Sequence, residues 1–272
     1  MTKSQNYLIF AHYHSKGLIR KDLLNFLKRT KNIFKEVIFI STKLKESEKL
    51  KIPKNIRVIK RKNIGYDFYS YKIGCKYFIK KFKKNLNDKN LFFINSSILF
   101  VDSVKLMKIM KSIKIKDNEI WGLTKSYELT EHIQSYFFCY SASIFKNKKI
   151  FEWWDKIKAF TKRQEIVDKY ELGMSNLMLQ NHIKLQSIFK KNLDLKPITI
   201  IQKIRQKYRE VFLKEIKYYK KNPTNYFWKD FYYKFGLVKI ELIKANHKKI
   251  NITELKKILE KNGNLEIEAI NN

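Results

Sequence analysis

A strand-to-helix transition is predicted at Lys60-Arg61-Lys62-Asn63-Ile64-Gly65-Tyr66-Asp67-Phe68-Tyr69-Ser70-Tyr71-Lys72, which follows the apolar run 56–59. A strand end with one Gly, one Asn and one Asp is where an α/β fold presents polar groups to a ligand. Gly65 allows a tight turn, while Asn63 and Asp67 offer amide and carboxylate partners. The basic residues 60–62 could neutralise a diphosphate. An ordinary strand–loop–helix corner is the alternative, because Gly and Asn are common in turns.

Apolar runs and helical periods alternate through the first half of the chain. Strands are predicted at 7–11, 36–41, 56–59 and 91–95, and helices at 18–29, 68–82 and 104–113. Asp102 or Ser103 is the expected N-cap of the third helix. This alternation predicts an α/β fold whose mostly parallel sheet is covered by helices on both faces.

The pattern becomes mixed from residue 120 onward. Strands are predicted at 120–124 and 135–142, and helices at 150–160 and 164–180, the second interrupted near Gly173. After Pro197 the chain becomes basic, aromatic and helical, and it ends in a helix at 251–261 capped by Asn251 or Thr253.

The composition limits the class of protein. A chain of 272 residues with 44% hydrophobic content can bury a sizeable core. The net charge of +34 attracts nucleic acid, anionic lipid or phosphorylated ligands, although the scattered lysines also fit a compositional bias. Cys75 and Cys139 give neither a disulfide framework nor a metal site, and fit a reducing cytoplasm. Without a signal-peptide core or a long apolar run, a soluble or peripheral protein is expected.

The order of several motifs adds a family resemblance. Asn63-Ile64-Gly65-Tyr66-Asp67-Phe68-Tyr69-Ser70-Tyr71-Lys72 resembles the signature of the rhamnan synthesis protein F family, sugar transferases of bacterial surface polysaccharides. Other segments follow in the family's order, namely His12–Gly17, Asn95–Ser97, Trp121–Thr124, His132–Phe137, Tyr170–Ser175 and Asn222–Trp228. Each motif alone is weak, but the ordered set is specific.

The resemblance implies a fold and an activity. It implies a glycosyltransferase-A-like domain over 1–196, with a nucleotide-binding half (1–118) and an acceptor half (119–196), and a basic aromatic helical extension (197–272) packed on it. The implied enzyme moves a sugar, rhamnose or another deoxyhexose being candidates, from a nucleotide-sugar donor to a growing capsule, O-antigen or rhamnan. A lipid-carried acceptor glycan would place it in the cytoplasm, peripheral to the inner face of the membrane.

Donor-binding residues are expected at the strand ends of the first half. His12 and Tyr13 follow the first strand, and Asn63, Gly65, Tyr66 and Asp67 follow the third. Asn95, Ser96 and Ser97 follow the fourth. Lys72 could reach a phosphate from the helix. The alternatives are a surface-loop histidine for His12 and a solvated helix face for Lys72.

Asn95-Ser96-Ser97 departs from the usual pattern of glycosyltransferase-A enzymes. These enzymes often carry an Asp-x-Asp-like element here, because carboxylate oxygens suit the Mg²⁺ or Mn²⁺ that balances the diphosphate. After this strand the chain has no carboxylate until Asp102, which is the candidate ligand if a metal binds. We therefore expect basic residues to replace the metal. A plain turn is the alternative.

The general base would be a carboxylate of the acceptor half. Glu171 is the first candidate, and Glu131 and His132 are the second, each with an exposed or structural role as the alternative. The expected acceptor-binding residues are Trp121, which could instead be a core residue, and the polar set Gln134, Ser135 and Tyr136.

Two other classes of protein compete with the enzyme. A catalytically silent relative could bind only glycan or partner enzymes. A nucleic-acid-binding protein would fit the charge, but no binding module is recognisable in the sequence. The basic aromatic stretch Lys203–Lys249 suits an anionic membrane surface or single-stranded nucleic acid, or plain helical packing. The donor sugar, the acceptor, the linkage and the oligomeric state stay open.

Overall fold

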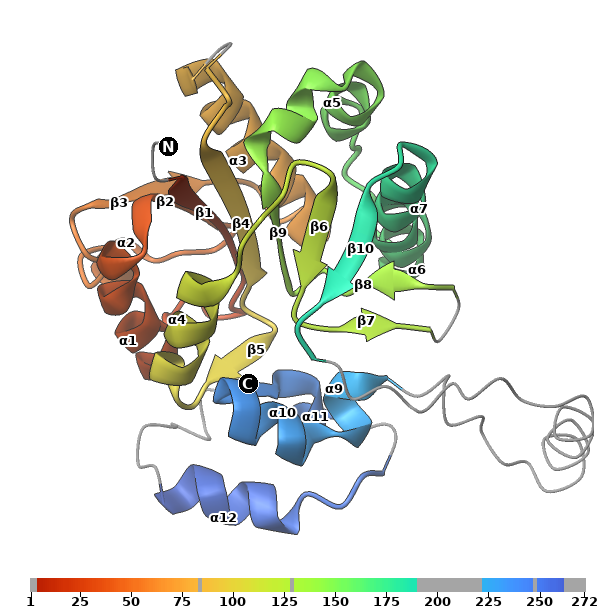
Figure 1. Cartoon of the computed structure of the whole chain (residues 1–272). Coiled ribbons are helices and arrows are strands. Elements are labelled where there is room, and N and C mark those ends of the chain that lie inside the picture. Colours follow the sequence, from red (N-terminus) through yellow and green to blue (C-terminus); the bar gives the residue numbers. More distant parts are fainter. Residues whose placement is uncertain (1–3, 83–84, 128–129, 190–221, 247–248, 262–272) are drawn as a thin grey trace, which may run out of the picture.

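The computed structural model describes residues 4–82, 85–127, 130–189, 222–246 and 249–261. Its centre is a seven-stranded sheet with the order β10-β6-β9-β4-β1-β2-β3 (Figure 1). The strands are β1 (Gln5–His12), β2 (Phe34–Ser41), β3 (Ile56–Lys60), β4 (Lys89–Asn95), β6 (Glu119–Gly122), β9 (Phe137–Ser141) and β10 (Lys184–Ser187). Among these described strands, β9 alone is antiparallel to its neighbours. The predicted mostly parallel sheet is confirmed.

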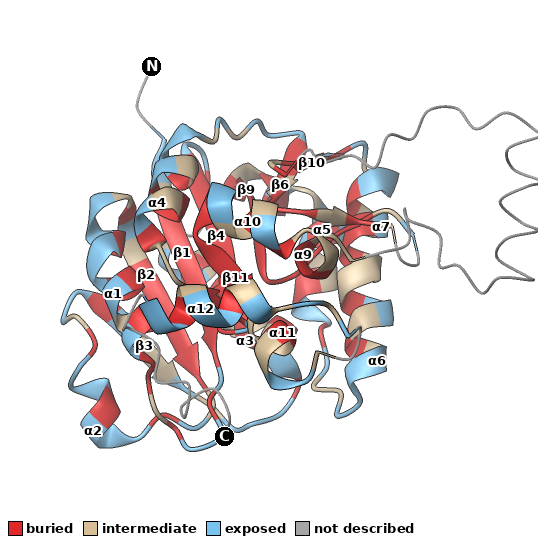
Figure 2. Cartoon of the chain, turned by 90° about the horizontal axis from the view of Figure 1, so that it is seen from below, coloured by how far each residue is buried: buried red, intermediate tan, exposed pale blue. Residues whose placement is uncertain are grey.

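Helices cover both faces of the sheet because its strands are apolar on both sides. Tyr7 and Ile9 of β1 join one core cluster, while Leu8 and Phe10 join the other. The first cluster contains residues of α3 (Tyr66–Phe82), α5 (Lys148–Asp155) and α7 (Gly173–Gln180), and the second those of α1 (Lys21–Arg29), α4 (Ser103–Ser112) and α10 (Trp228–Phe235). Figure 2 shows the buried strands between helices that are exposed on their outer sides. The sheet is therefore the middle layer of three.

The sequence had predicted that the C-terminal segment is helical throughout. In the structure this segment also contains a strand, and it packs into the fold. It contains α9 (Pro223–Tyr226), α10, β11 (Leu237–Lys239), α11 (Ile240–Lys244) and α12 (Thr253–Lys261). Gly236 ends α10 with a left-handed φ of 68°, and its carbonyl accepts from the Asp102 N–H. The chain then pairs β11 antiparallel with β5 (Ile98–Phe100). The part of the predicted stretch Lys203–Lys249 that precedes residue 222 lies outside the described residues, as do residues 247–248.

Other expected boundaries differ in detail. The helix predicted at 150–160 ends at Asp155, and that at 164–180 consists of α6 (Arg163–Ile166), a π-helical turn (Val167–Leu172) and α7. The side chains of Asp102 and Asn251 cap α4 and α12 as predicted. Short elements without a clear sequence period were missed, namely α2 (Glu46–Lys49), β7 (Lys125–Ser126), β8 (His132–Ile133), β10 and the 3-10 turns Thr30–Asn32 and Ala142–Lys146. No described helix has the length and apolarity needed to span a membrane.

A buried ion pair between Arg20 and Asp22 holds the loop that follows β4. The Arg20 Nε lies 2.9 Å from the Asp22 Oδ1, and both side chains are almost fully buried. Arg20 also donates to the carbonyl oxygens of Ser96 (3.1 Å) and Ile98 (2.7 Å). The Asp22 carboxylate accepts from the Phe100 N–H at 2.9 Å. One ion pair thus fixes the backbone from the end of β4 to the end of β5.

We predict that Asp22→Ala destabilises the fold by about 3–5 kcal/mol, because it leaves the Arg20 charge buried without a counter-ion. Urea denaturation followed by circular dichroism measures the change. Glu46→Ala, which removes an exposed partner of Lys60, is the control and should change stability little. Equal, small losses in both variants would contradict the structural role of the pair.

Candidate active site

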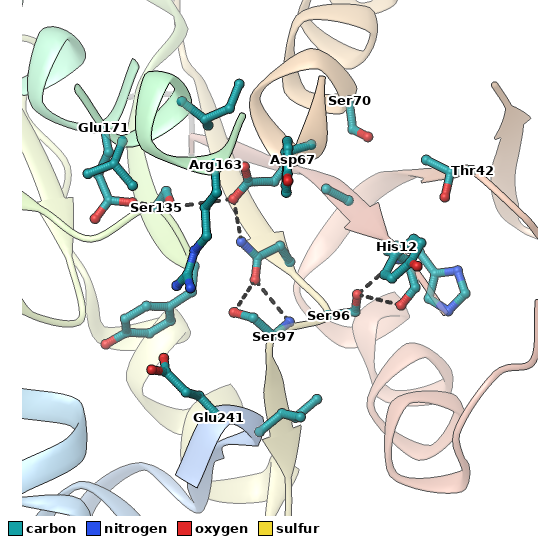
Figure 3. Close-up of a pocket in the computed structure, with 18 of the residues that line it drawn as sticks. His12, Thr42, Asp67, Ser70, Ser96, Ser97, Ser135, Arg163, Glu171 and Glu241 are labelled. Carbon is teal, nitrogen blue, oxygen red and sulfur yellow. Dashed lines mark hydrogen bonds between the residues drawn. The ribbon is translucent and has the colours of Figure 1, made fainter. Parts of the chain in front are cut away.

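A cavity of about 1290 Å³ opens at the carboxyl ends of the parallel strands. Its walls come from the residues that follow β1, β2, β3 and β4, from α6 and the π-helical turn, and from the C-terminal segment. Figure 3 shows side chains from these separate elements pointing toward one space. Ligands of open α/β sheets bind at such strand ends. This cavity is therefore the candidate site.

The loop after β3 reaches the cavity through a turn that only glycine fits well. Gly65 has a φ of 72°, and a Cβ there would lie 2.7 Å from the Tyr69 Cβ and 2.8 Å from the Ala159 Cα. Arg61 braces this turn by donating to the carbonyl oxygens of residues 62, 64 and 66. Burial lowers the pKa of Arg61 to about 10. Gly65, Asn63 and Tyr66 all line the cavity.

Of the three basic residues at 60–62, which the sequence suggested as a phosphate site, only Arg61 lines the cavity. Lys60 pairs with Glu46 on the surface, and Arg61 is committed to the loop carbonyls. Neither Lys60 nor Lys62 lines the cavity.

Asn95 links Asp67 to the loop that follows β4. Its Nδ2 donates to the Asp67 Oδ2 at 2.7 Å, and its Oδ1 accepts from the Ser97 N–H (3.0 Å) and Oγ–H (2.6 Å). Burial and the negative charge of Glu171 raise the pKa of Asp67, although the hydrogen bond from Asn95 opposes this. The predicted donor residues Asp67, Asn95 and Ser97 are thus brought together in one network.

Glu171 faces Asp67 across Ser135. The Ser135 Oγ lies 2.6 Å from the Glu171 Oε2 and 3.3 Å from the Asp67 Oδ2. The His132 Nε2 lies 3.4 Å from the Glu171 Oε1. Burial alone would raise the pKa of Glu171, but hydrogen bonds from His132 and Ser135, with the charge of Lys239 nearby, bring it below the usual value. Glu171 is therefore an ionised carboxylate in the cavity at neutral pH.

His132 is arranged to orient Glu171. Its Nδ1 lies 2.8 Å from the carbonyl oxygen of Thr130, while its Nε2 faces the Glu171 carboxylate. Each ring nitrogen thus faces an oxygen acceptor. The ring can donate a hydrogen bond to both oxygens when both nitrogens carry a proton. Glu131, the other reserve candidate for the base, is instead bonded to Lys125 at 2.6 Å and does not line the cavity.

The end of β1 is tied to the end of β4. The Ser96 Oγ accepts from the Tyr13 N–H (2.9 Å) and donates to its carbonyl oxygen (3.2 Å). His12 is buried, and its Nδ1 lies 2.8 Å from the Ser41 Oγ. Burial and the charges of Arg20 and His14 lower the pKa of His12 to about 3, so its ring is neutral. His12, Tyr13 and Ser96 all line the cavity.

Three other predicted site residues lie outside the cavity. The Lys72 Nζ donates to the Ile157 carbonyl at 2.7 Å, and Asp102 caps α4. The Trp121 ring packs on the core, and its Nε1 donates to Glu119 at 3.1 Å. None of the three is among the residues that line the cavity.

The remaining acceptor candidates do line the cavity. Gln134 and Tyr136 share a contact with Thr124, whose Oγ1 lies 2.7 Å from the Gln134 Oε1 and 2.6 Å from the Tyr136 Oη. Ser135 lies between them in the chain and reaches Glu171. Gln134, Ser135 and Tyr136 thus form one wall of the cavity.

Several cavity residues were not predicted from the sequence. They include Arg20, Thr42, Arg163, Asn225, Lys239, Glu241 and Lys244. Asn225 falls in the recognised motif Asn222–Trp228, which could have pointed to it. Two of these residues have a buried polar atom without a hydrogen-bond partner in the described part of the chain, the Thr42 Oγ1 and the Asn225 Oδ1. Buried polar atoms are usually paired, so these two are candidate ligand contacts.

The residues at the end of β4 do not fit a divalent metal. Asn95 uses its amide on Asp67 and Ser97, and Ser96 uses its hydroxyl on Tyr13. The Lys239 Nζ, a cation, lies 3.2 Å from the Ser97 Oγ. Within the described ranges, no group of three or more His, Cys, Asp and Glu side chains is placed to hold a metal ion.

Comparison with known proteins defines the family. The sequence model of Rhamnan synthesis protein F matches residues 37–260, which is most of the chain. The chain belongs to this family, as the motifs had indicated.

A curated relative extends the match. The uncharacterized protein y4gN of Sinorhizobium fredii is 23% identical over 177 residues, which cover 63% of this chain and 45% of that protein. The chain thus spans less than half of that relative's length.

Solved structures resemble the chain distantly. The glycosyltransferase GlyE of Streptococcus pneumoniae has a TM-score of 0.47 at 10% identity, covering 100% of this chain and 63% of that one. A 4-diphosphocytidyl-2C-methyl-D-erythritol synthase has a TM-score of 0.44 at 9% identity, covering 75% of this chain and 99% of that one.

We predict that Thr42→Val lowers the affinity for a nucleoside diphosphate by about 0.5–1.5 kcal/mol, the value of one hydrogen bond, without loss of stability. Calorimetric titration and thermal denaturation measure the two quantities. Thr30→Val is the matched control, because the Thr30 hydroxyl donates to the Leu27 carbonyl away from the cavity. It should lower stability and leave affinity unchanged. Unchanged affinity in Thr42→Val would remove Thr42 from the ligand site.

Proposed function

We propose that the protein is a glycosyltransferase that moves a sugar from a nucleotide-sugar donor to a growing bacterial surface polysaccharide. One observation carries the proposal: an ionised carboxylate, Glu171, shares a hydroxyl contact with Asp67 in a large cavity at the strand ends. Sugar transfer needs such a carboxylate beside a donor site, and family membership supports the same activity.

The donor would lie across the strand ends. In this proposal the nucleoside contacts the His12, Tyr13 and Thr42 side of the cavity, in a glycosyltransferase-A-like arrangement. The diphosphate would lie near Ser97, and the transferred sugar would lie between Asp67 and Glu171. The acceptor sugar would then contact the wall made by residues 134–136.

Glu171 is proposed as the general base. It takes the proton of the acceptor hydroxyl while that oxygen attacks the anomeric carbon and the bond to the phosphate oxygen breaks. The environments of Asp67 and Glu171 shift their pKa values in opposite directions, which separates a group that holds its proton more readily from one that is ionised. His132 and Ser135 would keep the Glu171 carboxylate in position.

We predict that Glu171→Gln lowers sugar transfer by about 10²–10⁴-fold, the usual contribution of a positioned base, and leaves donor binding intact. Transfer is measured as nucleoside diphosphate released from UDP- and dTDP-sugars in the presence of glycan acceptors. Donor binding is measured as a rise in melting temperature. Glu165→Gln, on the same helical stretch but outside the cavity, is the matched control and should keep full activity.

Two outcomes would contradict these assignments. Transfer at the wild-type rate by Glu171→Gln would return the role of base to His132, the other candidate that lines the cavity. Donor binding by the wild-type protein without transfer to any acceptor would favour the catalytically silent relative.

We further propose that the enzyme works on a membrane-bound acceptor, held to anionic lipid by its net charge of +34. A lysine or arginine near such a surface contributes about 1 kcal/mol, and salt screens this attraction. Co-sedimentation with phosphatidylserine-containing vesicles should therefore fall steeply as salt rises, and neutral vesicles are the control. Tight binding to single-stranded DNA with no preference for anionic vesicles would favour the nucleic-acid-binding alternative.

A further inference from the structure

Lys239 is fixed beside the loop that follows β4. It pairs with Ile98 in the β11–β5 ladder, and the next N–H, of Ile240, donates to the Ser97 carbonyl at 3.0 Å. Its Nζ lies 3.2 Å from the Ser97 Oγ and 4.3 Å from the centre of the Tyr136 ring. Backbone pairing, rather than a flexible loop, therefore places this ammonium group at the end of β4.

The surroundings of Lys239 leave its charge available to a ligand. Glu171 of the π-helical turn, Glu241 of α11 and Asp67 of α3 attract the ammonium group, whereas Arg163 of α6 repels it. Within the described residues, neither Lys239 nor Arg163 forms an ion pair with a carboxylate. Arg163 points into the cavity (Figure 3). Both cations line the same cavity, and neither has an ion-pair partner among the described residues, so an anion that enters the cavity is favoured there.

We propose that Lys239, together with Arg163, binds the diphosphate of the donor in the place where related enzymes use a divalent metal. This inference rests on the proposed function. When the bond between the anomeric carbon and the phosphate oxygen breaks, its electron pair stays on the oxygen, and the two cations stabilise the added negative charge. The proton of the acceptor hydroxyl goes to Glu171.

The loop after β4, where related enzymes bind a metal, instead forms hydrogen bonds that suit a lysine. The Ser97 hydroxyl both donates to the Asn95 Oδ1 and accepts from Lys239, which a carboxylate at that position could not do. A lysine or arginine that contacts a phosphate forms charge-assisted hydrogen bonds, which are stronger than neutral ones. In this proposal the positive charge that balances the diphosphate thus comes from the Lys239 side chain.

Burial lowers the pKa of Lys239 to about 8, against the attraction of Glu171, Glu241 and Asp67. The charged form is therefore lost as pH rises through that value, and diphosphate affinity should fall over the same range. Lys239→Arg keeps its charge there, because arginine stays protonated in proteins. The pH dependence thus separates a charge contact from simple packing.

The test is calorimetric titration of the full chain with UDP, dTDP, the matching nucleosides and inorganic pyrophosphate, in EDTA and then in Mn²⁺. Lys239→Met should bind UDP, dTDP and pyrophosphate about tenfold to a hundredfold more weakly, with nucleoside affinity unchanged and no rescue by Mn²⁺. Lys239→Arg should bind the diphosphates as tightly as the wild-type protein does. It should keep this affinity at pH values above the pKa of Lys239, where the affinity of the wild-type protein falls. Lys234→Met, from the same segment but outside the cavity, is the matched control and should bind as wild type.

Each other outcome overturns the inference in a distinguishable way. Wild-type affinity of Lys239→Met for UDP or dTDP would remove Lys239 from the site while the proposed function stands. A gain of about a hundredfold when Mn²⁺ is added to the wild-type protein would show a true metal site. Binding of neither nucleoside diphosphate nor pyrophosphate by the wild-type protein would overturn the inference and the proposed function together.

Discussion

The hydrogen bonds of the Asn95 side chain are the constraint on which the cavity depends. An amide donates and accepts at once, so Asn95 can bind the Asp67 carboxylate with its NH₂ group and hold Ser97 with its oxygen. An aspartate here would place a second carboxylate against Asp67 and offer it no donor. The chain's departure from an acidic strand end therefore has a direct chemical reason.

From Asn95 a continuous series of contacts runs across the cavity. Ser97 and Lys239 lie on one side of it, and Asp67, Ser135 and Glu171 lie on the other. Polar networks in low-dielectric surroundings are favourable when every member is satisfied and costly when one is not. The network thus fixes the separation between the proposed diphosphate site and the proposed base. The Arg20–Asp22 pair holds the same loop, because Arg20 donates to the Ser96 carbonyl oxygen.

Much of the fold could be predicted from the sequence because the central strands are buried on both faces. Runs such as Leu91–Ile94 are apolar without interruption, which identifies each strand individually. The parallel topology then brings the carboxyl ends of these strands together. This is why His12, Asp67 and Asn95 were found although they lie far apart in the chain. Glu171 was located by its motif, and its place in the cavity agrees.

The rest could not be predicted, for physical reasons that differ from residue to residue. The sequence left Trp121 open between a sugar-stacking residue and a core residue, and the alternation along β6 turns it toward the core. The strand β11 is three residues long inside a basic segment, and its pairing with β5 is a tertiary effect. Lys239 and Arg163 are two of 59 lysine and arginine residues, and the sequence gives no sign that these two line the cavity.

The most direct test of the central claim is a crystal structure of the protein grown with UDP and Mn²⁺, with diffraction collected at the manganese absorption edge. We expect the diphosphate against Lys239 and Arg163, the nucleoside beside His12 and Thr42, and no anomalous peak between the phosphates and the protein. A manganese peak that bridges the phosphates to protein carboxylates, or a nucleotide bound away from the Asn95 loop, would contradict the account.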